Sequence, residues 1–363
     1  MATEAMPTAA AELDGGAMDC GSGLLLLLMR TIRGIDPGQV LLVRTEEPSV
    51  PPDLDDWARL AGHEILAAVA DAPGGPWQVA IRRGGAPGPA PEPAAVFSGG
   101  AATPVGHRLW LYSNFHCNLA CSYCCAKSSP QASPRQLSAA DALEAATQFA
   151  ALGGRELIVT GGEPFLHPQI GAMVTGLAAL LPVTVLTNAM VFERGARRDA
   201  LESMPRDRVN LQISLDSAEA DLHDRQRGAG SHAKALAGIA QARALGFTVR
   251  IAATLHDADA TAVGALNTLL DTLGIEPANR LIRPVAAQGY ATAGLPVGID
   301  TLEPEPTLTT EGIWWHPVAV TDPAMRIGDA TVPLSEALGI IRDTLAVQDA
   351  AHREGRRHVF RCA

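Results

Sequence analysis

The 363-residue sequence predicts an α/β protein built from two unequal units. A chain of this length favours about two domains. Residues 84–106 are dominated by Gly, Pro and Ala and have no apolar period, which is typical of a linker. Beyond them, apolar strands alternate with Ala-rich helices, which indicates a mainly parallel sheet. We therefore expect an N-terminal unit at 1–83, the linker, a core at 107–290 and an extension at 291–363.

The sequence of the N-terminal unit predicts a small two-layer β-α-β-α-β-β sandwich. The Leu-rich segment 21–33 favours a helix that ends before the Asp36-Pro37-Gly38 turn. A second helix is expected at Val50–Ala61, where prolines and aspartates occupy the first turn. Short apolar runs predict four strands, at Ala11–Gly15, Val40–Thr45, Glu64–Val69 and Trp77–Arg82.

The larger unit predicts a partial barrel of six βα units. The expected strands are Arg108–Tyr112, Glu156–Val159, Thr184–Leu186, Asn210–Ser214, Thr248–Ala253 and Arg280–Pro284. The expected helices are Ala139–Leu152, Gln169–Leu181, Ala196–Met204, Ala233–Leu245 and Ala260–Leu273. Barrels of this kind place their chemistry at the carboxyl ends of the strands. Functional residues are therefore sought in the loops that follow these strands.

Composition and charge exclude some functions. Lys and Arg number 28 and Asp and Glu number 39, so the net charge is −11 and nucleic acid is not an expected partner. The longest pure Leu run, Leu24–Leu28, is far shorter than the ~20 residues that span a membrane. No basic segment precedes it, so we expect neither a signal peptide nor a membrane partner, and we expect a cytoplasmic protein.

Four of the six cysteines lie close together after the first barrel strand. Cys117, Cys121 and Cys124 have C-x3-C-x2-C spacing, and three such thiolates can bind three irons of a cubane cluster. The fourth iron is then open to a cofactor or substrate. Zinc is the competing metal, but structural zinc takes four ligands, usually in two pairs, and no second pair follows. His116 or Cys125 could complete a zinc site, although both are poorly spaced for it.

The cysteine motif, with Tyr123 before its last cysteine, resembles the radical SAM superfamily. The resemblance covers about residues 107–290. It implies a partial (βα)6 TIM-like barrel in which the three cysteines hold a [4Fe-4S] cluster. It also implies that the open iron chelates S-adenosylmethionine, whose reductive cleavage yields a 5′-deoxyadenosyl radical.

Further matches to this superfamily follow the next strands. The segment Gly161-Gly162-Glu163-Pro164 is similar to its GGEP motif, which binds the methionyl amino group. Polar residues at the third and fourth strand ends, and an arginine beyond them, also resemble the family. For Arg227, a helix-capping salt bridge is an equal alternative. The resemblance implies that the cofactor contacts Tyr123, Gly161, Gly162, Glu163, Pro164, Asn188, Ser214, Asp216 and Arg227.

Cys20 is a second candidate reactive residue, at the start of the first helix. Backbone N–H groups at a helix start stabilise a thiolate, so Cys20 could carry a persulfide. Element order, unit length and the spacing from Asp14 resemble the TusA-like sulfur carriers. That family usually has Cys-Pro-x-Pro where this chain has Cys20-Gly-Ser-Gly23, which puts carrier chemistry in doubt more than the fold. The alternative is a docking domain in which Cys20 is a small buried residue.

Together the two units predict a radical SAM enzyme that modifies an unidentified small molecule or peptide. An electron donor such as flavodoxin or ferredoxin is implied, and sulfur could reach the substrate from a cysteine desulfurase through Cys20. Only Cys125 and Cys362 remain, too few for an auxiliary cluster. Radical oxidation, epimerisation or rearrangement, with the N-terminal unit as a docking module, is therefore an alternative. A non-catalytic sulfur-trafficking or cluster-binding protein is the alternative of another class.

The C-terminal segment supports fewer predictions. Trp314, Trp315 and His316 either line a substrate pocket or, as the favoured interpretation, cover the open edge of the barrel. Arg283, at the end of the last strand, is a candidate partner for a substrate carboxylate or phosphate. A final amphipathic helix is expected at Leu334–Gln348. Cys362 has no assigned role.

Overall fold

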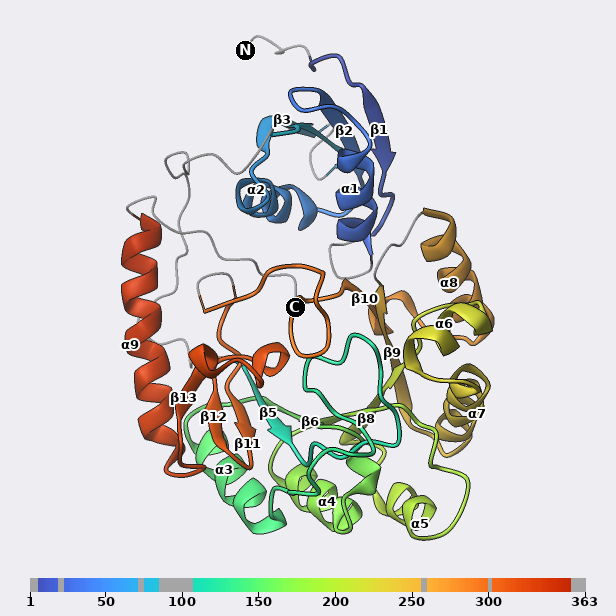
Figure 1. The fold of residues 1–363 in the computed structure, drawn as a ribbon, viewed down its shortest axis with the longest axis vertical. Helices are drawn as coiled ribbons and strands as arrows, with labels where there is room; N and C mark the ends of the chain where they lie inside the picture. The colour runs from blue at the N-terminus through green and yellow to red at the C-terminus, as the bar shows by residue number, and fades with distance from the viewer. Residues whose placement is uncertain are drawn as a thin grey trace.

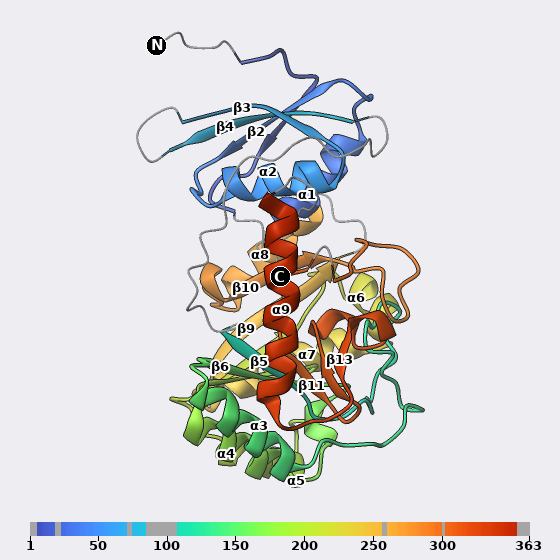
Figure 2. The same ribbon diagram turned by 90° about the vertical axis from the view of Figure 1, so that its left-hand side faces the viewer.

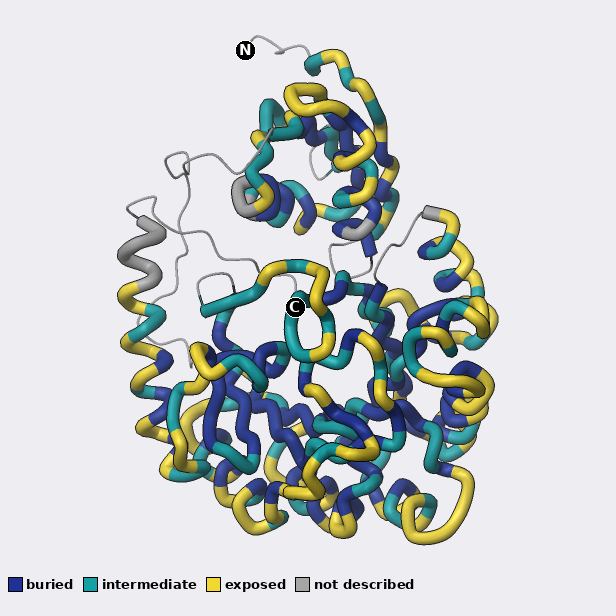
Figure 3. The backbone as a smooth tube through the Cα atoms, viewed as in Figure 1, coloured by how far each residue is buried: buried dark blue, intermediate teal, exposed yellow. Residues whose placement is uncertain are grey.

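The computed structural model describes residues 6–18, 23–70, 75–84, 107–255, 260–299 and 302–353. They form two units, a small one at the N-terminus and a larger one that contains the long sheet (Figure 1). The predicted linker lies outside the described residues except for Gly84 at its start. Buried residues are concentrated along the strands and on the helix faces that pack against them (Figure 3).

The N-terminal unit has the predicted element order. Its sheet runs β1-β2-β4-β3, with β1 parallel to β2 and the other pairs antiparallel. Both helices cover one face of this sheet (Figure 2). Helix α1 begins at Leu24, later than predicted, because Gly23 has a left-handed φ of 113°. The elements are β1 (Ala11–Asp14), α1 (Leu24–Arg33), β2 (Val40–Thr45), α2 (Val50–Leu60), β3 (Glu64–Ala70) and β4 (Trp77–Arg82).

The larger unit contains the six predicted parallel strands, adjacent in chain order within one sheet. Most of their residues are buried, as is usual in parallel sheets. The first five strands, β5 to β9 in chain order, are each followed by a loop at the carboxyl end and a crossover that returns outside the sheet. The strands are β5 (Arg108–Tyr112), β6 (Glu156–Thr160), β7 (Val183–Thr187), β8 (Val209–Ser214), β9 (Thr248–Leu255) and β10 (Arg280–Pro284).

The crossover helices cover the outer face of this sheet (Figure 1). All five predicted helices are present within a few residues of their expected bounds. One short helix, α6, was not predicted, because its eight residues are mostly charged and lack an apolar stripe. The helices are α3 (Ala139–Ala151), η1 (Pro164–Leu166), α4 (Ile170–Leu180), α5 (Ala196–Ser203), α6 (Ala220–Arg227), α7 (Ser231–Ala244), α8 (Ala260–Thr272) and η2 (Pro277–Asn279).

The C-terminal extension lengthens the sheet beyond β5. Strand β11 pairs parallel to β5, and β12 and β13 follow in antiparallel order, so β10 and β13 are the sheet's two edges. The sheet is therefore open and, in the described part of the chain, forms no closed barrel. Trp314 and Trp315 are buried within this extension and line no part of the cavity described below, as the edge-covering interpretation expects, whereas His316 does line that cavity. The elements are β11 (Thr307–Thr309), β12 (Gly312–Trp314), η3 (Pro317–Ala319), η4 (Pro323–Met325), β13 (Arg326–Gly328) and α9 (Leu334–Arg353).

The two units touch where α1 meets the edge strand β10. A Cβ at Gly23 would lie 3.3 Å from Val263 Cγ1 and 3.4 Å from Ile282 Cγ2, so the start of α1 packs against the larger unit. Among the helices that the structure describes, none combines the length and apolar character that a membrane crossing needs.

Candidate functional site

A cavity of about 240 Å³ lies at the carboxyl ends of the parallel strands. This is where the barrel architecture predicts the chemistry. Every one of the six strands contributes a lining residue at or near its last position: Tyr112, Thr160, Thr187, Ser214, Thr254 and Pro284. The cysteine loop and the C-terminal extension complete the walls.

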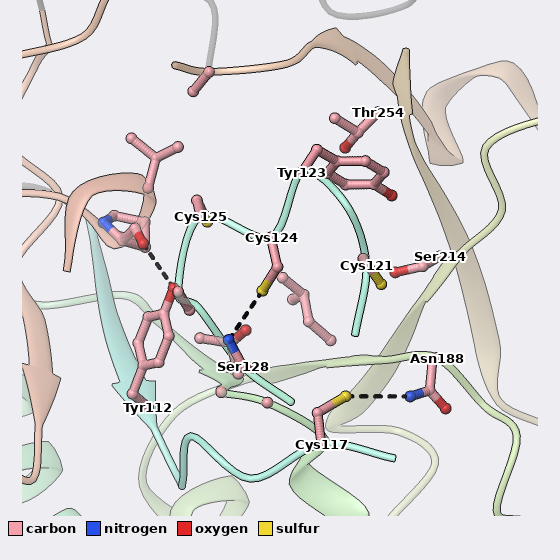
Figure 4. Close-up of a pocket in the computed structure, with 18 of the residues that line it drawn as sticks. Tyr112, Cys117, Cys121, Tyr123, Cys124, Cys125, Ser128, Asn188, Ser214 and Thr254 are labelled. Atoms are coloured by element: carbon pink, nitrogen blue, oxygen red, sulfur yellow. Dashed lines mark hydrogen bonds between the residues drawn. The ribbon is translucent and has the colours of Figure 1, made fainter. Parts of the chain in front are cut away.

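The three motif cysteines all line this cavity. The loop that carries them follows β5 and is held by backbone bonds, including Cys117 N–H to Ser129 O at 3.2 Å and Cys124 N–H to Cys121 O at 3.1 Å. Figure 4 shows the sulfur atoms of Cys117, Cys121 and Cys124 around one shared space, whereas Cys125 lies on the Tyr112 side of Cys124. The three motif cysteines thus line one cavity, and their role as cluster ligands stays a prediction.

The electrostatics around the thiols suit ligands of a cationic group. Burial, followed by the charge of Glu163, raises the pKa of Cys117 to about 12. Burial also raises the pKa of Cys121, although Arg227 opposes this. Without a bound cation these thiols hold their protons, whereas coordination to a metal deprotonates a thiol outright.

Three N–H donors already point at the cysteine sulfurs. Leu119 N–H donates to Cys117 Sγ and Ser128 N–H donates to Cys124 Sγ, both at 3.4 Å. The Asn188 side-chain amide reaches Cys117 Sγ at 3.9 Å (Figure 4). Hydrogen bonds to the sulfurs are a standard feature of iron–sulfur sites. The donor set therefore fits a thiolate-bound cluster.

In the described ranges, no three His, Cys, Asp or Glu side chains converge closely enough to share one metal ion. A zinc site gathers four ligands on a single ion at about 2.0–2.3 Å. In an iron–sulfur cluster each iron takes its own thiolate, so the ligands surround a larger body.

The Gly161-Gly162 pair brings the end of β6 against the cysteine loop. Gly161 has a φ of 144°, and a Cβ there would lie 2.4 Å from Asn114 O. A Cβ on Gly162 would lie 2.2 Å from His116 O. Gly162 N–H donates to Asn114 O at 2.9 Å, and Glu163 N–H to His116 O at 3.0 Å. Two glycines are needed here because only they let the two backbones approach this closely.

Glu163 lies behind the cavity wall. It is fully buried, and it does not line the cavity. Its carboxylate accepts hydrogen bonds from Thr187 Oγ1 at 2.7 Å, Asn188 N–H at 2.9 Å and Phe165 N–H at 3.1 Å. Burial raises the pKa of Glu163, although these hydrogen bonds oppose it. Pro164, also buried, begins η1 next to it.

Asp216 is also buried behind the cavity, where it holds three residues that line the cavity. It accepts from Arg227 Nε at 2.6 Å and Nη2 at 3.1 Å, from Tyr123 OH, and from Thr254 N–H at 3.0 Å. Burial alone would raise the pKa of Asp216, but the charge and hydrogen bonds of Arg227 outweigh it and lower the pKa. The Arg227 guanidinium lies 5.5 Å from the centre of the Tyr123 ring. Arg227 thus pairs with the end of β8 and does not cap its own helix.

The predicted residues divide into two groups. Those that line the cavity are Cys117, Cys121, Tyr123, Cys124, Gly161, Gly162, Asn188, Ser214 and Arg227. Those buried behind it are Glu163, Pro164 and Asp216. Cys20 and Cys362 lie outside the described residues, so the structure does not test the predicted thiol at Cys20.

Gly289 and Tyr290, in the loop after β10, hold the cysteine loop but were not predicted. Tyr290 N–H donates to Cys124 O at 3.0 Å, and its hydroxyl donates to Lys127 O at 3.1 Å. Gly289 has a φ of 65°, and a Cβ there would lie 2.2 Å from Cys124 O and 2.4 Å from Cys125 O. A Gly-Tyr pair after a strand was the only available signal, and it is common in ordinary turns.

Residues 112–259 match the sequence profile of the Radical SAM superfamily. This part of the chain is therefore a radical SAM domain, and the family implies S-adenosylmethionine and a [4Fe-4S] cluster as its cofactors. The match spans both the cysteine loop and the glycine turn.

Two curated relatives illustrate the similarity. GTP 3′,8-cyclase of Pseudomonas fluorescens is 34% identical over 145 residues, which cover 36% of this chain and 40% of the relative. Pre-heme d1 synthase of Dinoroseobacter shibae is 28% identical over 187 residues, which cover 51% of this chain and 45% of the relative. The chain thus spans less than half the length of these relatives. The activities in their names are those of the two relatives alone.

The fold also resembles a solved structure. The chain matches native anSMEcpe with bound AdoMet at a TM-score of 0.53 and 11% identity, over 69% of this chain and 88% of that one. At this identity the likeness concerns the fold alone.

We predict that Asp216→Asn strongly destabilises the protein. The substitution removes the charge that compensates Arg227, whose side chain is only 10% exposed. Breaking a buried ion pair on one side costs about 3–5 kcal/mol. The free energy of unfolding, from urea denaturation, tests this. The matched control is Glu202→Gln, which breaks the more exposed Arg198 pair and should cost less than about 1 kcal/mol. Equal losses in both variants would contradict the prediction.

We predict that Gly289→Ala impairs cluster loading. The added methyl group meets the carbonyls of Cys124 and Cys125, so the cysteine loop must shift, at a cost of about 1–3 kcal/mol. Iron and labile sulfide per chain should fall after anaerobic reconstitution. Gly298→Ala is the control, since a Cβ there meets nothing within 4 Å. Full iron loading in the Gly289 variant would show that the contact does not position the loop.

Proposed function

We propose that this protein is a radical SAM enzyme. Cys117, Cys121 and Cys124 bind a [4Fe-4S] cluster, and S-adenosylmethionine binds beside it in the same cavity. The observation that carries this proposal is the convergence of three thiols on a cavity lined by all six strand ends. When bound, the cluster supplies the electron that cleaves S-adenosylmethionine to methionine and a 5′-deoxyadenosyl radical.

The cofactor contacts are assigned by position. Tyr123, Gly161, Gly162, Asn188, Ser214 and Arg227 line the cavity and are the proposed S-adenosylmethionine contacts. Backbone carbonyls near Gly161-Gly162 can accept from the methionyl ammonium. Glu163, Pro164 and Asp216 act from behind the wall as positioning residues. In this assignment the acid of the GGEP motif orders the ends of β6 and β7 through Thr187 and Asn188.

The chain also has to limit side reactions of the radical. The cavity's walls include apolar and aromatic groups, and the strand ends bury its base. Exclusion of water and pre-positioned polar groups protect reactive intermediates in such sites. The substrate, an unidentified small molecule or peptide, enters the same cavity. A cytoplasmic electron donor such as flavodoxin or ferredoxin would reduce the cluster.

We expect each of Cys117→Ala, Cys121→Ala and Cys124→Ala to abolish cluster binding, because each removes one thiolate ligand. The reconstituted parent should hold about four irons per chain and form 5′-deoxyadenosine when reduced with S-adenosylmethionine. Iron assay and liquid chromatography measure both quantities. Cys125→Ala is the control for iron content and should retain it. A reduced, iron-loaded parent that never forms 5′-deoxyadenosine would rule out the enzyme.

We also propose a second role, in which the N-terminal unit carries sulfur on Cys20 for the radical reaction. Two observations favour it. The unit has the β-α-β-α-β-β order expected of a TusA-like carrier. Gly23, three residues after Cys20, packs against Val263 and Ile282 of the larger unit. The carrier motif is therefore close in sequence to the contact between the two units.

The sulfur role predicts a persulfide on Cys20. After incubation with a cysteine desulfurase and cysteine, the parent should gain about 32 Da, the mass of one sulfur atom. Cys20→Ala should not, because its thiol is absent. Intact-protein mass spectrometry decides this, with Cys125→Ala as the control for modification elsewhere. If the Cys20 variant gains the same mass, the N-terminal unit is better explained as a docking module for an oxidation, epimerisation or rearrangement.

A further inference from the structure

One wall of the cavity lies away from β7 and β8, and its lining differs in polarity from the side that we propose for the cofactor. It is formed by β5, the end of β10 and the C-terminal extension, and its lining is largely apolar or aromatic. Its residues include Trp110, Tyr112, Pro284, Pro317 and Val318, together with two charged residues, Arg283 and Glu305. An apolar wall with a few polar groups is typical of a site that orients a small organic ligand.

Arg283 carries a charge that the protein does not pair. Within the described residues, no hydrogen bond or ion pair joins its guanidinium to another group. The acid whose charge acts on it, Glu305, is already engaged: Arg108 donates to one carboxylate oxygen and Trp110 Nε1 to the other. Burial lowers the pKa of Arg283, yet arginine stays protonated in proteins. Arg283 is half-buried, and a partly desolvated cation with no direct partner favours an anion.

Apart from Glu305, which Arg108 and Trp110 already engage, the neighbouring polar groups are neutral, and one of them provides a donor. Burial raises the pKa of Tyr112 well above its ordinary value, and its hydroxyl donates to Pro317 O at 2.6 Å. Burial and the charges of Arg283 and Arg108 lower the pKa of His316 to about 3, so its ring is neutral at pH 7. His316 Nδ1 accepts from Val318 N–H at 3.2 Å, which leaves the ring proton on Nε2. In the part of the chain that the structure describes, nothing accepts that proton.

We propose that Arg283 and His316 bind an anionic group of the substrate, a carboxylate or a phosphate, whose apolar body lies against Trp110 and Tyr112. Arginine binds such anions through two parallel hydrogen bonds, and the His316 Nε2–H adds a third donor. This inference rests on the proposed function, because it places the substrate in the cavity that the cysteines line. The inferred substrate is therefore a small organic acid or a phosphate ester.

The test is calorimetric titration of the cluster-loaded, S-adenosylmethionine-saturated, unreduced protein with benzoate, phenyl phosphate and neutral benzamide. We expect benzoate or phenyl phosphate to bind more tightly than benzamide, and the tighter of the two identifies the anionic group. Arg283→Gln should weaken that binding about tenfold or more. Arg283→Lys should weaken it less, because lysine keeps the positive charge but lacks the two parallel N–H donors of the guanidinium. Arg250→Gln is the matched control, a cation on neighbouring β9 that does not line the cavity, and it should bind like the parent.

Three outcomes would overturn the inference: benzamide binding as tightly as both anions, unchanged binding in Arg283→Gln, or equal weakening in Arg250→Gln. The formation of 5′-deoxyadenosine without substrate is measured separately on the same samples. We expect it in the parent and in Arg250→Gln, since Arg250 does not line the cavity. Loss of anion binding in Arg283→Gln, with binding and S-adenosylmethionine cleavage kept in Arg250→Gln, supports the inference. A parent that binds the anion but never cleaves S-adenosylmethionine contradicts the proposed function alone.

Discussion

The close backbone contact between the Gly161-Gly162 turn and the cysteine loop is the constraint on which the site depends. The cysteine loop has internal hydrogen bonds, such as Cys124 N–H to Cys121 O, but its position against the strand ends is set by contacts with its neighbours. The glycine turn supplies two backbone hydrogen bonds to Asn114 and His116, at a separation that any side chain would prevent. On the opposite side of the loop, Tyr290 and Gly289 contact Cys124 and Cys125. The loop is thus held between the ends of β6 and β10.

Two buried carboxylates extend this arrangement to the remaining strands. Glu163 joins the end of β6 to Thr187 and Asn188 at the end of β7. Asp216 joins the end of β8 to Thr254 near the end of β9, and it also holds Tyr123 of the cysteine loop. A carboxylate is suited to this task because it can accept several hydrogen bonds at once. Each strand end is therefore tied, directly or through one acid, to the loop that carries the cysteines.

Much of this fold could be predicted from the sequence, because six short apolar strands separated by Ala-rich helices leave little choice of architecture. The cysteine spacing and the Gly-Gly turn likewise identified the site. The short strands β11–β13 could not be predicted, since three residues carry no measurable period. The buried position of Glu163 could not be predicted either, because a sequence does not show to which side of a turn a side chain points. The contact of Gly289 with the cysteine loop joins residues far apart in the chain, which local patterns cannot reveal.

Charged side chains around this cavity fall into two kinds. Some are fully paired with other protein groups and hold the structure, and others lack such partners and can bind a ligand. Glu163 and Asp216 each accept several hydrogen bonds from protein donors, Arg227 among them. The two carboxylates have little capacity left for a ligand, so their contribution is to hold the wall in place. Arg283 and the His316 Nε2–H lack such partners among the described residues, and a buried or partly buried polar group left in that state is costly. The same cavity thus has one wall whose charges are compensated internally and one on which the charge of Arg283 is left for a ligand, which is the asymmetry expected where a cofactor and a substrate meet.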